Sequence, residues 1–241
     1  MEGQARAFGG EAAPRWVAAN LAGFTLGGAL AGGVLRFLGQ PFYGNIEDAI
    51  EAAALQTAIT GLGTAVFGIV IGTAEWVVLR GTLRAGWWPA ATVAGWVLTG
   101  IVIGVLAGLS GSSVSDIGPG SGPVPVAVSA PVGLAAALLV FGSFQWLVLR
   151  QQTDGANAWP LASPLALMAG LAAGFFVVRF LLVEVVPLLH DTDFPSAQAL
   201  VLVGAVSGLV YGLLTWPALA RLRPRIVADV YTRDVGPSTM R

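Results

Sequence analysis

The chain alternates long apolar segments with short polar ones, and six of the apolar segments are long enough to cross a lipid bilayer. A helix needs roughly 20 apolar residues to span a hydrocarbon core of about 30 Å. The six segments lie at about 15–38, 52–79, 88–109, 126–149, 161–187 and 196–220. The pattern therefore predicts an all-α integral membrane protein with six transmembrane helices.

A short motif recurs at a spacing of seventy residues, near the end of every second apolar segment. The first copy reads Gly72-Thr-Ala-Glu-Trp76-Val-Val-Leu-Arg80, and the second reads Gly142-Ser-Phe-Gln-Trp146-Leu-Val-Leu-Arg150. The third reads Gly212-Leu-Leu-Thr-Trp216-Pro-Ala-Leu-Ala-Arg221, in which the arginine comes one residue later. A fixed period of this size indicates a duplicated structural unit.

Each seventy-residue unit contains two crossings and is expected to form one helical hairpin. The predicted divisions are a cytoplasmic N-terminal segment at 1–14, hairpins at 15–80, 81–150 and 151–221, and a cytoplasmic tail at 222–241. Because successive units run parallel, we expect a pseudo-threefold axis along the membrane normal to relate the three tandem hairpins.

Arginine is distributed unevenly between the two ends of the predicted helices. The N-terminal segment, the loops at 80–87 and 150–159 and the C-terminal tail contain Arg6, Arg15, Arg80, Arg84, Arg150, Arg221, Arg223, Arg225, Arg233 and Arg241. Cytoplasmic loops of membrane proteins are enriched in basic residues. The distribution therefore predicts a multi-pass protein of the cytoplasmic (inner) membrane with both termini in the cytoplasm.

Seven of the tryptophans fall near the same predicted cytoplasmic ends: Trp16, Trp76, Trp87, Trp88, Trp146, Trp159 and Trp216. Tryptophan is enriched at membrane–water interfaces. We interpret the seven side chains as an aromatic belt, with a pigment or lipid site built on the same rings as the alternative.

Composition narrows the class of protein. The chain is 56% hydrophobic and 10% charged, whereas soluble domains are about 25% charged. With a net charge of −1 there is no basic face for a nucleic acid. The absence of cysteine and the presence of a single histidine, His190, exclude disulfides, thiolate metal sites and a two-histidine haem within one chain. No catalytic motif is present, so we predict a protein that is not an enzyme and has no cofactor.

Glycines recur every four residues in several helices, as in Gly204, Gly208 and Gly212 or Gly100, Gly104 and Gly108. This spacing forms a groove on one helix face that lets a neighbouring backbone approach closely. We expect tight packing within the chain, with contacts between copies as the alternative.

Two arginines lie inside the predicted outer ends of the helices, at equivalent places in the first and third hairpins: Arg36 and Arg179. The same hairpins carry Glu51 and Asp191 at matching positions, whereas the middle hairpin lacks both the arginine and the carboxylate. An unpaired charge in a membrane is costly. We therefore predict structural charge pairs, with Glu184 as a competing partner of Arg179. An anion or substrate site and snorkelling to the interface are the alternatives.

Glu75 precedes the first repeat tryptophan, and Gln145 and Thr215 occupy its place in the other copies. All three can accept a hydrogen bond. We predict an interfacial polar contact to a backbone amide or to Arg80, with a proton-relay acid as the alternative. His190, beside Asp191 and Asp193, is interpreted as a solvated loop residue rather than a weak metal ligand.

Two motifs of the chain are also found in a known group of proteins. They are Gln145-Trp-Leu-Val-Leu-Arg150 and the pair Trp87-Trp88 that follows Arg80. The chain resembles small multi-pass bacterial membrane proteins of unknown function, in which the first motif ends a glycine-rich helix and Gly-Trp-Trp opens the next. The likeness covers most of 61–110 and 131–175. It departs at Asn157-Ala-Trp159 and at Pro217. It implies topology and no catalytic residue.

The sequence favours a scaffold or accessory subunit of a membrane complex, in contact with the lipid bilayer and with possible protein partners. One alternative is a small transporter or channel with a pathway along the pseudo-threefold axis. The other is a lipid or pigment binder between hairpins.

Overall fold

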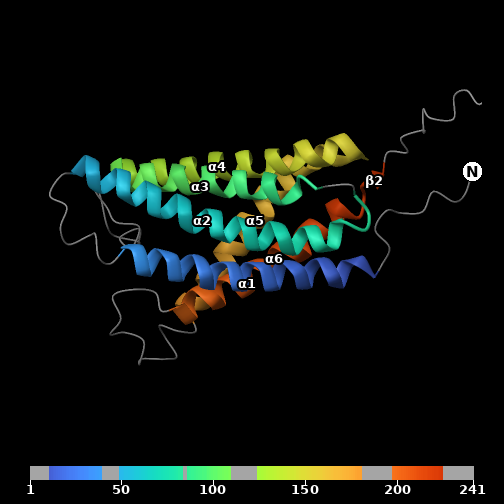
Figure 1. Ribbon diagram of the computed structural model, residues 1–241, viewed down its shortest axis with the longest axis horizontal. Helices are drawn as coiled ribbons and strands as arrows, with labels where there is room; N and C mark the ends of the chain where they lie inside the picture. Colours follow the sequence, from blue (N-terminus) through green and yellow to red (C-terminus); the bar gives the residue numbers. More distant parts are fainter. Residues whose placement is uncertain (1–10, 40–48, 84–85, 110–123, 181–196, 225–241) are drawn as a thin grey trace, which may run out of the picture.

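The computed structural model describes residues 11–39, 49–83, 86–109, 124–180 and 197–224. These residues form six long α-helices, which lie side by side along the longest axis of the molecule (Figure 1). The helices are α1 (Ala12–Gly39), α2 (Ala49–Leu79), α3 (Trp88–Leu109), α4 (Val124–Gln152), α5 (Trp159–Val178) and α6 (Ala197–Leu219).

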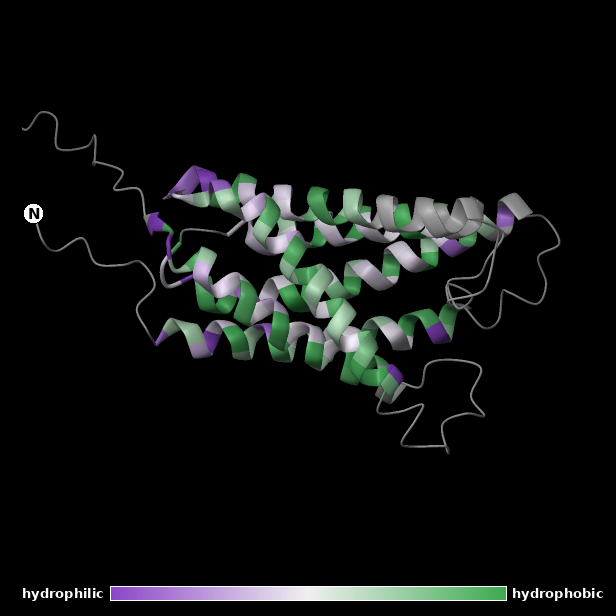
Figure 2. Ribbon diagram, turned by 180° about the vertical axis from the view of Figure 1, so that it is seen from behind, coloured by the Kyte–Doolittle hydropathy of each residue, from purple (hydrophilic) through white to green (hydrophobic). Residues whose placement is uncertain are grey.

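Within the residues that the structure describes, five of the six predicted spans are matched by segments long and apolar enough to cross a membrane: Ala12–Leu38, Ala53–Leu79, Trp88–Val105, Ala156–Val178 and Leu200–Leu219. Figure 2 shows apolar residues along the helices and several hydrophilic segments near their ends. The all-helical architecture and these spans make the chain a polytopic membrane protein. The predicted apolar segments agree with the helices, except that α5 ends at Val178 and residues 181–196 lie outside the described part.

Prolines stand near the start of three helices. Pro14, Pro89 and Pro160 are each within the first three residues of α1, α3 and α5. At these positions the backbone N–H has no acceptor inside the helix, so its loss costs little. The prolines therefore fit the observed helix starts.

The helices pack in chain order, and α6 returns to pack against α1. The motif glycines lie in the contact between each even-numbered helix and the helix that follows it in this order. A Cβ atom on Gly72 would lie 3.1 Å from Cα of Pro89, and one on Gly212 would lie 3.0 Å from Cα of Val17. On Gly142 it would lie 3.1 Å from the carbonyl oxygen of Pro160. Glycine thus allows the helices to approach closely at three places.

A two-stranded pairing closes one end of the bundle. Strand β1 (Thr153–Asp154) follows α4 and pairs antiparallel with β2 (Arg223–Pro224), which follows α6. The turn after β1 passes through Gly155, whose φ of 88° favours glycine, into the 3₁₀ helix η2 (Ala156–Ala158). The predicted tail at 222–241 therefore begins with a paired segment, and its residues 225–241 lie outside the description.

Aromatic rings fill the middle of the bundle. Phe24 of α1 contacts the rings of Phe67 and Tyr211 with centroid separations of 5.4 Å each. Trp96 of α3 contacts Phe67 at 4.6 Å and Phe141 of α4 at 5.2 Å. Edge-to-face and tilted aromatic pairs of this kind each contribute about 0.5–1.5 kcal/mol beyond area burial. They join α1, α2, α3, α4 and α6 in one core.

Candidate functional site

Three buried tryptophans lie near the starts of α1, α3 and α5. Trp16, Trp88 and Trp159 are at most 1% exposed. The ring of Trp159 meets Trp16 at 6.4 Å and Trp88 at 6.0 Å, in both cases edge to face. The three side chains therefore form one contiguous cluster, called the tryptophan cluster below, and the end of the bundle that contains it is called the tryptophan end.

Each of these tryptophans donates its indole N–H to the side chain that precedes a repeat tryptophan. The donors lie on odd-numbered helices and the acceptors on even-numbered ones. The bonds are Trp16 Nε1 to Thr215 Oγ1 at 3.0 Å, Trp88 Nε1 to Glu75 Oε2 at 2.9 Å and Trp159 Nε1 to Gln145 Oε1 at 3.1 Å. One of them, Trp16 to Thr215, links the first helix to the last.

A buried polar side chain follows each of these tryptophans by four residues, and hence lies one helical turn further along. The three are Asn20, Thr92 and Ser163. Gln145 contacts two of them, since its Nε2 donates to Thr92 Oγ1 at 3.3 Å and its Oε1 accepts from Ser163 Oγ at 3.1 Å. Gln145 Nε2 also lies 3.4 Å from Glu75 Oε2.

Tyr211 extends this network to α6. Its hydroxyl lies 2.9 Å from Ser163 Oγ and donates to Gln145 Oε1 at 3.5 Å. Thr215 donates to the carbonyl oxygen of Tyr211 at 2.7 Å. Together with the tryptophan bonds, these contacts involve side chains from all six helices. A change of position of one helix would therefore break hydrogen bonds to its neighbours.

Glu75 is completely buried within this network. Its Oε2 accepts from Trp88 and Gln145, while its Oε1 has no hydrogen-bond partner among the described residues. The prediction of an interfacial contact to a backbone amide or to Arg80 was wrong, because Glu75 points into the bundle and bonds side chains of α3 and α4. The amide oxygen of Asn20 is likewise buried without a described partner.

The aromatic-belt interpretation was wrong for Trp16, Trp88 and Trp159. A belt places its rings against lipid and headgroups, whereas these rings face the interior. Trp87, which is next to Trp88 in the chain, is 78% exposed and can serve as a belt residue. The direction of each ring depends on the helix face that carries it, so adjacent tryptophans differ completely in burial.

The repeat tryptophans pair with the arginines of their own motif in the first two copies. The guanidinium carbon of Arg150 lies 4.6 Å from the ring centroid of Trp146, and that of Arg80 lies 5.6 Å from the ring of Trp76. These are cation–π distances. The four-residue spacing between tryptophan and arginine, which places both on one helix face, is the sequence signal for this contact.

The predicted charge pairs are only partly within the described residues. Arg36 is exposed in the last turn of α1, and Glu51 lies in the first turn of α2. Their pairing stays a prediction. Arg179 is exposed at the end of α5, and its two predicted partners, Glu184 and Asp191, lie outside the described residues, as does His190.

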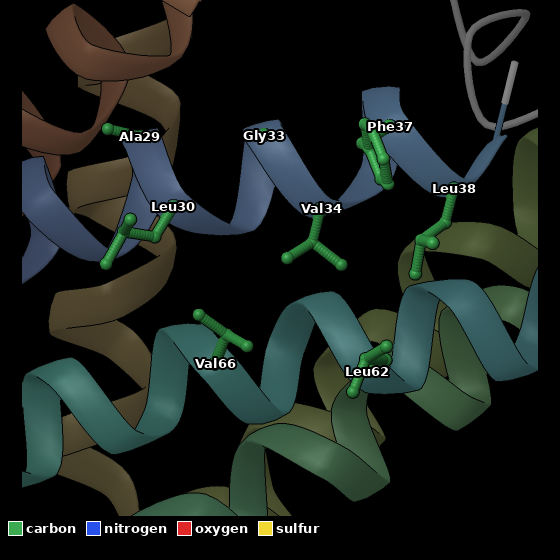
Figure 3. Close-up of a pocket in the computed structure, with 8 residues that line it drawn as sticks. All are labelled: Ala29, Leu30, Gly33, Val34, Phe37, Leu38, Leu62 and Val66. Atoms are coloured by element: carbon green, nitrogen blue, oxygen red, sulfur yellow. The ribbon is translucent and has the colours of Figure 1, made fainter.

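An apolar groove lies between α1 and α2, toward the end of α1 (Figure 3). Its volume is about 490 Å³. Its lining residues are all apolar: Ala29, Leu30, Gly33, Val34, Phe37 and Leu38 of α1 with Leu62 and Val66 of α2. Figure 3 shows Leu30 and Val34 directed toward α2 and Val66 directed toward α1.

The polar groups of the tryptophan end are used mainly to join helices. Hydroxyl, amide and indole groups there bond one another across helix contacts, and within the described ranges no three acidic, histidine or cysteine side chains gather into a metal site. Buried polar side chains that bond across helices stabilise helix association in a membrane. These bonds therefore hold the six helices together at the tryptophan end.

No protein-family model matches the chain, and no curated protein or solved structure matches it.

Proposed function

We propose that the protein is a non-enzymatic scaffold or accessory subunit of a membrane complex. The observation that carries this proposal is the tryptophan cluster, whose hydrogen bonds use the polar side chains most able to do chemistry in holding the helices together. A bundle joined in this way keeps its outer surface in a fixed shape. A fixed outer surface is what a subunit needs in order to position other proteins.

The same contacts support an arrangement of three tandem hairpins about a pseudo-threefold axis. Each hairpin contributes one tryptophan near its start and one acceptor before its repeat tryptophan. Each motif glycine lies against the N-terminal part of the next helix in the order of packing, and α6 contacts α1 in this way. A rotation by one third of a turn about a common axis would interchange these contacts.

The arginine pattern supports an orientation with the tryptophan end at the cytoplasmic face of the cytoplasmic membrane. Arg80 and Arg150 lie at this end, as do the start of α1 and strand β2 (Figure 1). The resemblance to small multi-pass bacterial membrane proteins is consistent with that location, and it adds no activity.

The transport alternative requires a pathway through the middle of the bundle. At the tryptophan end this space contains buried indole rings in edge contact, and further along it contains Phe24, Trp96 and Phe141. A solute would have to displace these rings. The structure therefore gives less support to a channel than to a subunit.

Cross-linking in intact cells, followed by mild detergent extraction and native gel analysis, tests the proposal. We expect the chain to migrate in an assembly larger than its own 24.6 kDa. The same proteins should be cross-linked to it, at a fixed ratio, in repeated preparations. Deleting the chain should reduce the amount of that assembly.

Purified chain in proteoliposomes provides the opposing test. If the interior is a pathway, solute flux should exceed that of empty liposomes. It should rise further in Trp159→Ala, because this variant opens the tryptophan cluster. Recovery of the chain only as an isolated monomer under all cross-linking conditions would also contradict the scaffold proposal.

A further inference from the structure

The groove between α1 and α2 differs from the close helix contacts because the single glycine in its lining, Gly33, faces open space. A Cβ atom on Gly33 would meet nothing within 4 Å. By contrast, a Cβ atom on Gly27 would meet the ring of Phe67, and one on Gly28 or Gly32 would meet Leu200 of α6. Among the described residues Gly33 therefore packs against no neighbouring helix, and it widens the groove.

The side chains around the groove suit a flexible apolar chain better than a second helix. Close helix–helix contacts in membranes use small residues, and the glycines of α1 that could supply them already contact Phe67 and Leu200. The outward-facing surface of α1 along the groove is bordered by bulky side chains, among them Phe37, which is 81% exposed, and Leu30, which is 55% exposed. An acyl chain can bend between such side chains.

The groove has a basic residue at one end. Arg36 is three residues after Gly33 and seven after Ala29, and these spacings place all three on one face of α1. Arg36 is exposed in the last turn of the helix. A guanidinium binds phosphate oxygens in a bidentate manner, so the apolar groove leads to a group that suits an anionic headgroup.

We propose that the groove binds one acyl chain of an anionic phospholipid, whose phosphate is held by Arg36. The groove lies on membrane-spanning segments and opens to the outside of the bundle, so lipid is the medium that reaches it. The site is within the first hairpin, and it is independent of the scaffold function.

Native mass spectrometry of the purified full chain tests this proposal with a mixture of phosphatidylglycerol and phosphatidylcholine. We expect the wild-type chain to retain one phosphatidylglycerol in preference to phosphatidylcholine. Arg36→Gln should reduce that preference by about fivefold, the change expected when one basic residue near an anionic headgroup is lost. Arg179→Gln removes an exposed arginine at the end of α5 and is the matched control, which should keep the preference.

Filling the groove tests the acyl-chain part separately. Gly33→Leu places a side chain in open space, so the chain should fold normally and lose the retained lipid. Val66→Phe fills the groove from α2 and should act in the same way, while Ala172→Leu adds bulk to an exposed position of α5 and should change nothing.

Equal lipid retention in wild type, Gly33→Leu and Val66→Phe would overturn the proposal. So would a wild-type dimer that Gly33→Leu converts to monomer, because a second copy would then occupy the groove. Loss of retained lipid in Arg179→Gln to the same extent as in Arg36→Gln would show that only net charge matters.

Discussion

The indole N–H of Trp88 donates to Oε2 of Glu75 over 2.9 Å, although the two residues are thirteen positions apart on consecutive helices. Trp159 and Gln145 repeat this relationship with a separation of fourteen positions and a distance of 3.1 Å. The acid and the amide thus accept the same kind of bond in different hairpins. This correspondence allows the role of the carboxyl group to be tested.

Replacement of Glu75 by glutamine should leave the bundle close to wild type in stability, because an amide oxygen can accept the bond from Trp88 as Gln145 does from Trp159. Replacement by leucine should cost about 1–3 kcal/mol, since it leaves the buried indole N–H without an acceptor. Thermal unfolding of the two purified variants in detergent measures the change in stability caused by each replacement. Equal destabilisation by glutamine and leucine would mean that the carboxyl group itself is required.

Trp159→Phe should destabilise the bundle by about 1–3 kcal/mol. The variant loses the bond to Gln145 and weakens the edge contacts to Trp16 and Trp88, and each aromatic contact contributes about 0.5–1.5 kcal/mol. Trp87→Phe is the matched control and should be neutral, because Trp87 is exposed. Unfolding in increasing fractions of sodium dodecyl sulfate measures the stability of the two variants. A similar loss of stability in Trp159→Phe and Trp87→Phe would argue against the tryptophan cluster.

Gly212→Ala should destabilise the contact between α6 and α1 by about 1–3 kcal/mol, the usual cost of overpacking, because the new methyl group would press on the α1 backbone at Val17. Gly33→Ala should be neutral or stabilising by up to about 1 kcal/mol, since alanine favours helix and the position is open. Melting temperatures of the two variants test this difference. A lower melting temperature for Gly33→Ala than for Gly212→Ala would contradict the close approach of α1 and α6.

Trp146 and Arg150 should be energetically coupled by about 0.5–1 kcal/mol, the value of an exposed cation–π contact. A double-mutant cycle with Trp146→Leu and Arg150→Gln measures this coupling. The cycle on Trp76 and Arg80 should give a smaller value, because the separation there is 5.6 Å instead of 4.6 Å. Purely additive losses in both cycles would leave the contacts without an energetic role.

Single cysteines can test the orientation, because the natural chain contains none. Gly86→Cys lies between α2 and α3 at the tryptophan end and should react with a membrane-impermeant maleimide only from the cytoplasmic side. Asn45→Cys, in the predicted outer loop, should react only from the opposite side. Labelling of intact cells and of inverted vesicles distinguishes the two, and the reverse pattern would invert the proposed topology.

Several features of the fold followed from the sequence. The apolar segments predicted the helix positions closely, because crossing a bilayer requires a continuous apolar run whatever the neighbours of the helix are. Prolines stand near the starts of α1, α3 and α5 for an equally local reason, the missing acceptor for their backbone N–H. The seventy-residue period identified Glu75, Gln145 and Thr215 as equivalent positions, and these became the three acceptors of the tryptophan cluster.

The donors were missed, although a signal was present. Trp16, Trp88 and Trp159 recur at nearly the same period, and each is followed four residues later by a polar side chain. The tryptophans were assigned to an interfacial belt because they lie near helix ends. The polar residues at the following turn were the indication that this face of each odd-numbered helix turns inward.

The sequence by itself determined which segments form long apolar helices, since this depends on local apolar content. Only the tertiary structure decided which face of each helix is inside, that α6 closes against α1, and that Glu75 bonds to Trp88. In a membrane both lipid and core are apolar, so hydropathy barely distinguishes the two faces of a helix, and the choice is made by packing and by hydrogen bonds between helices.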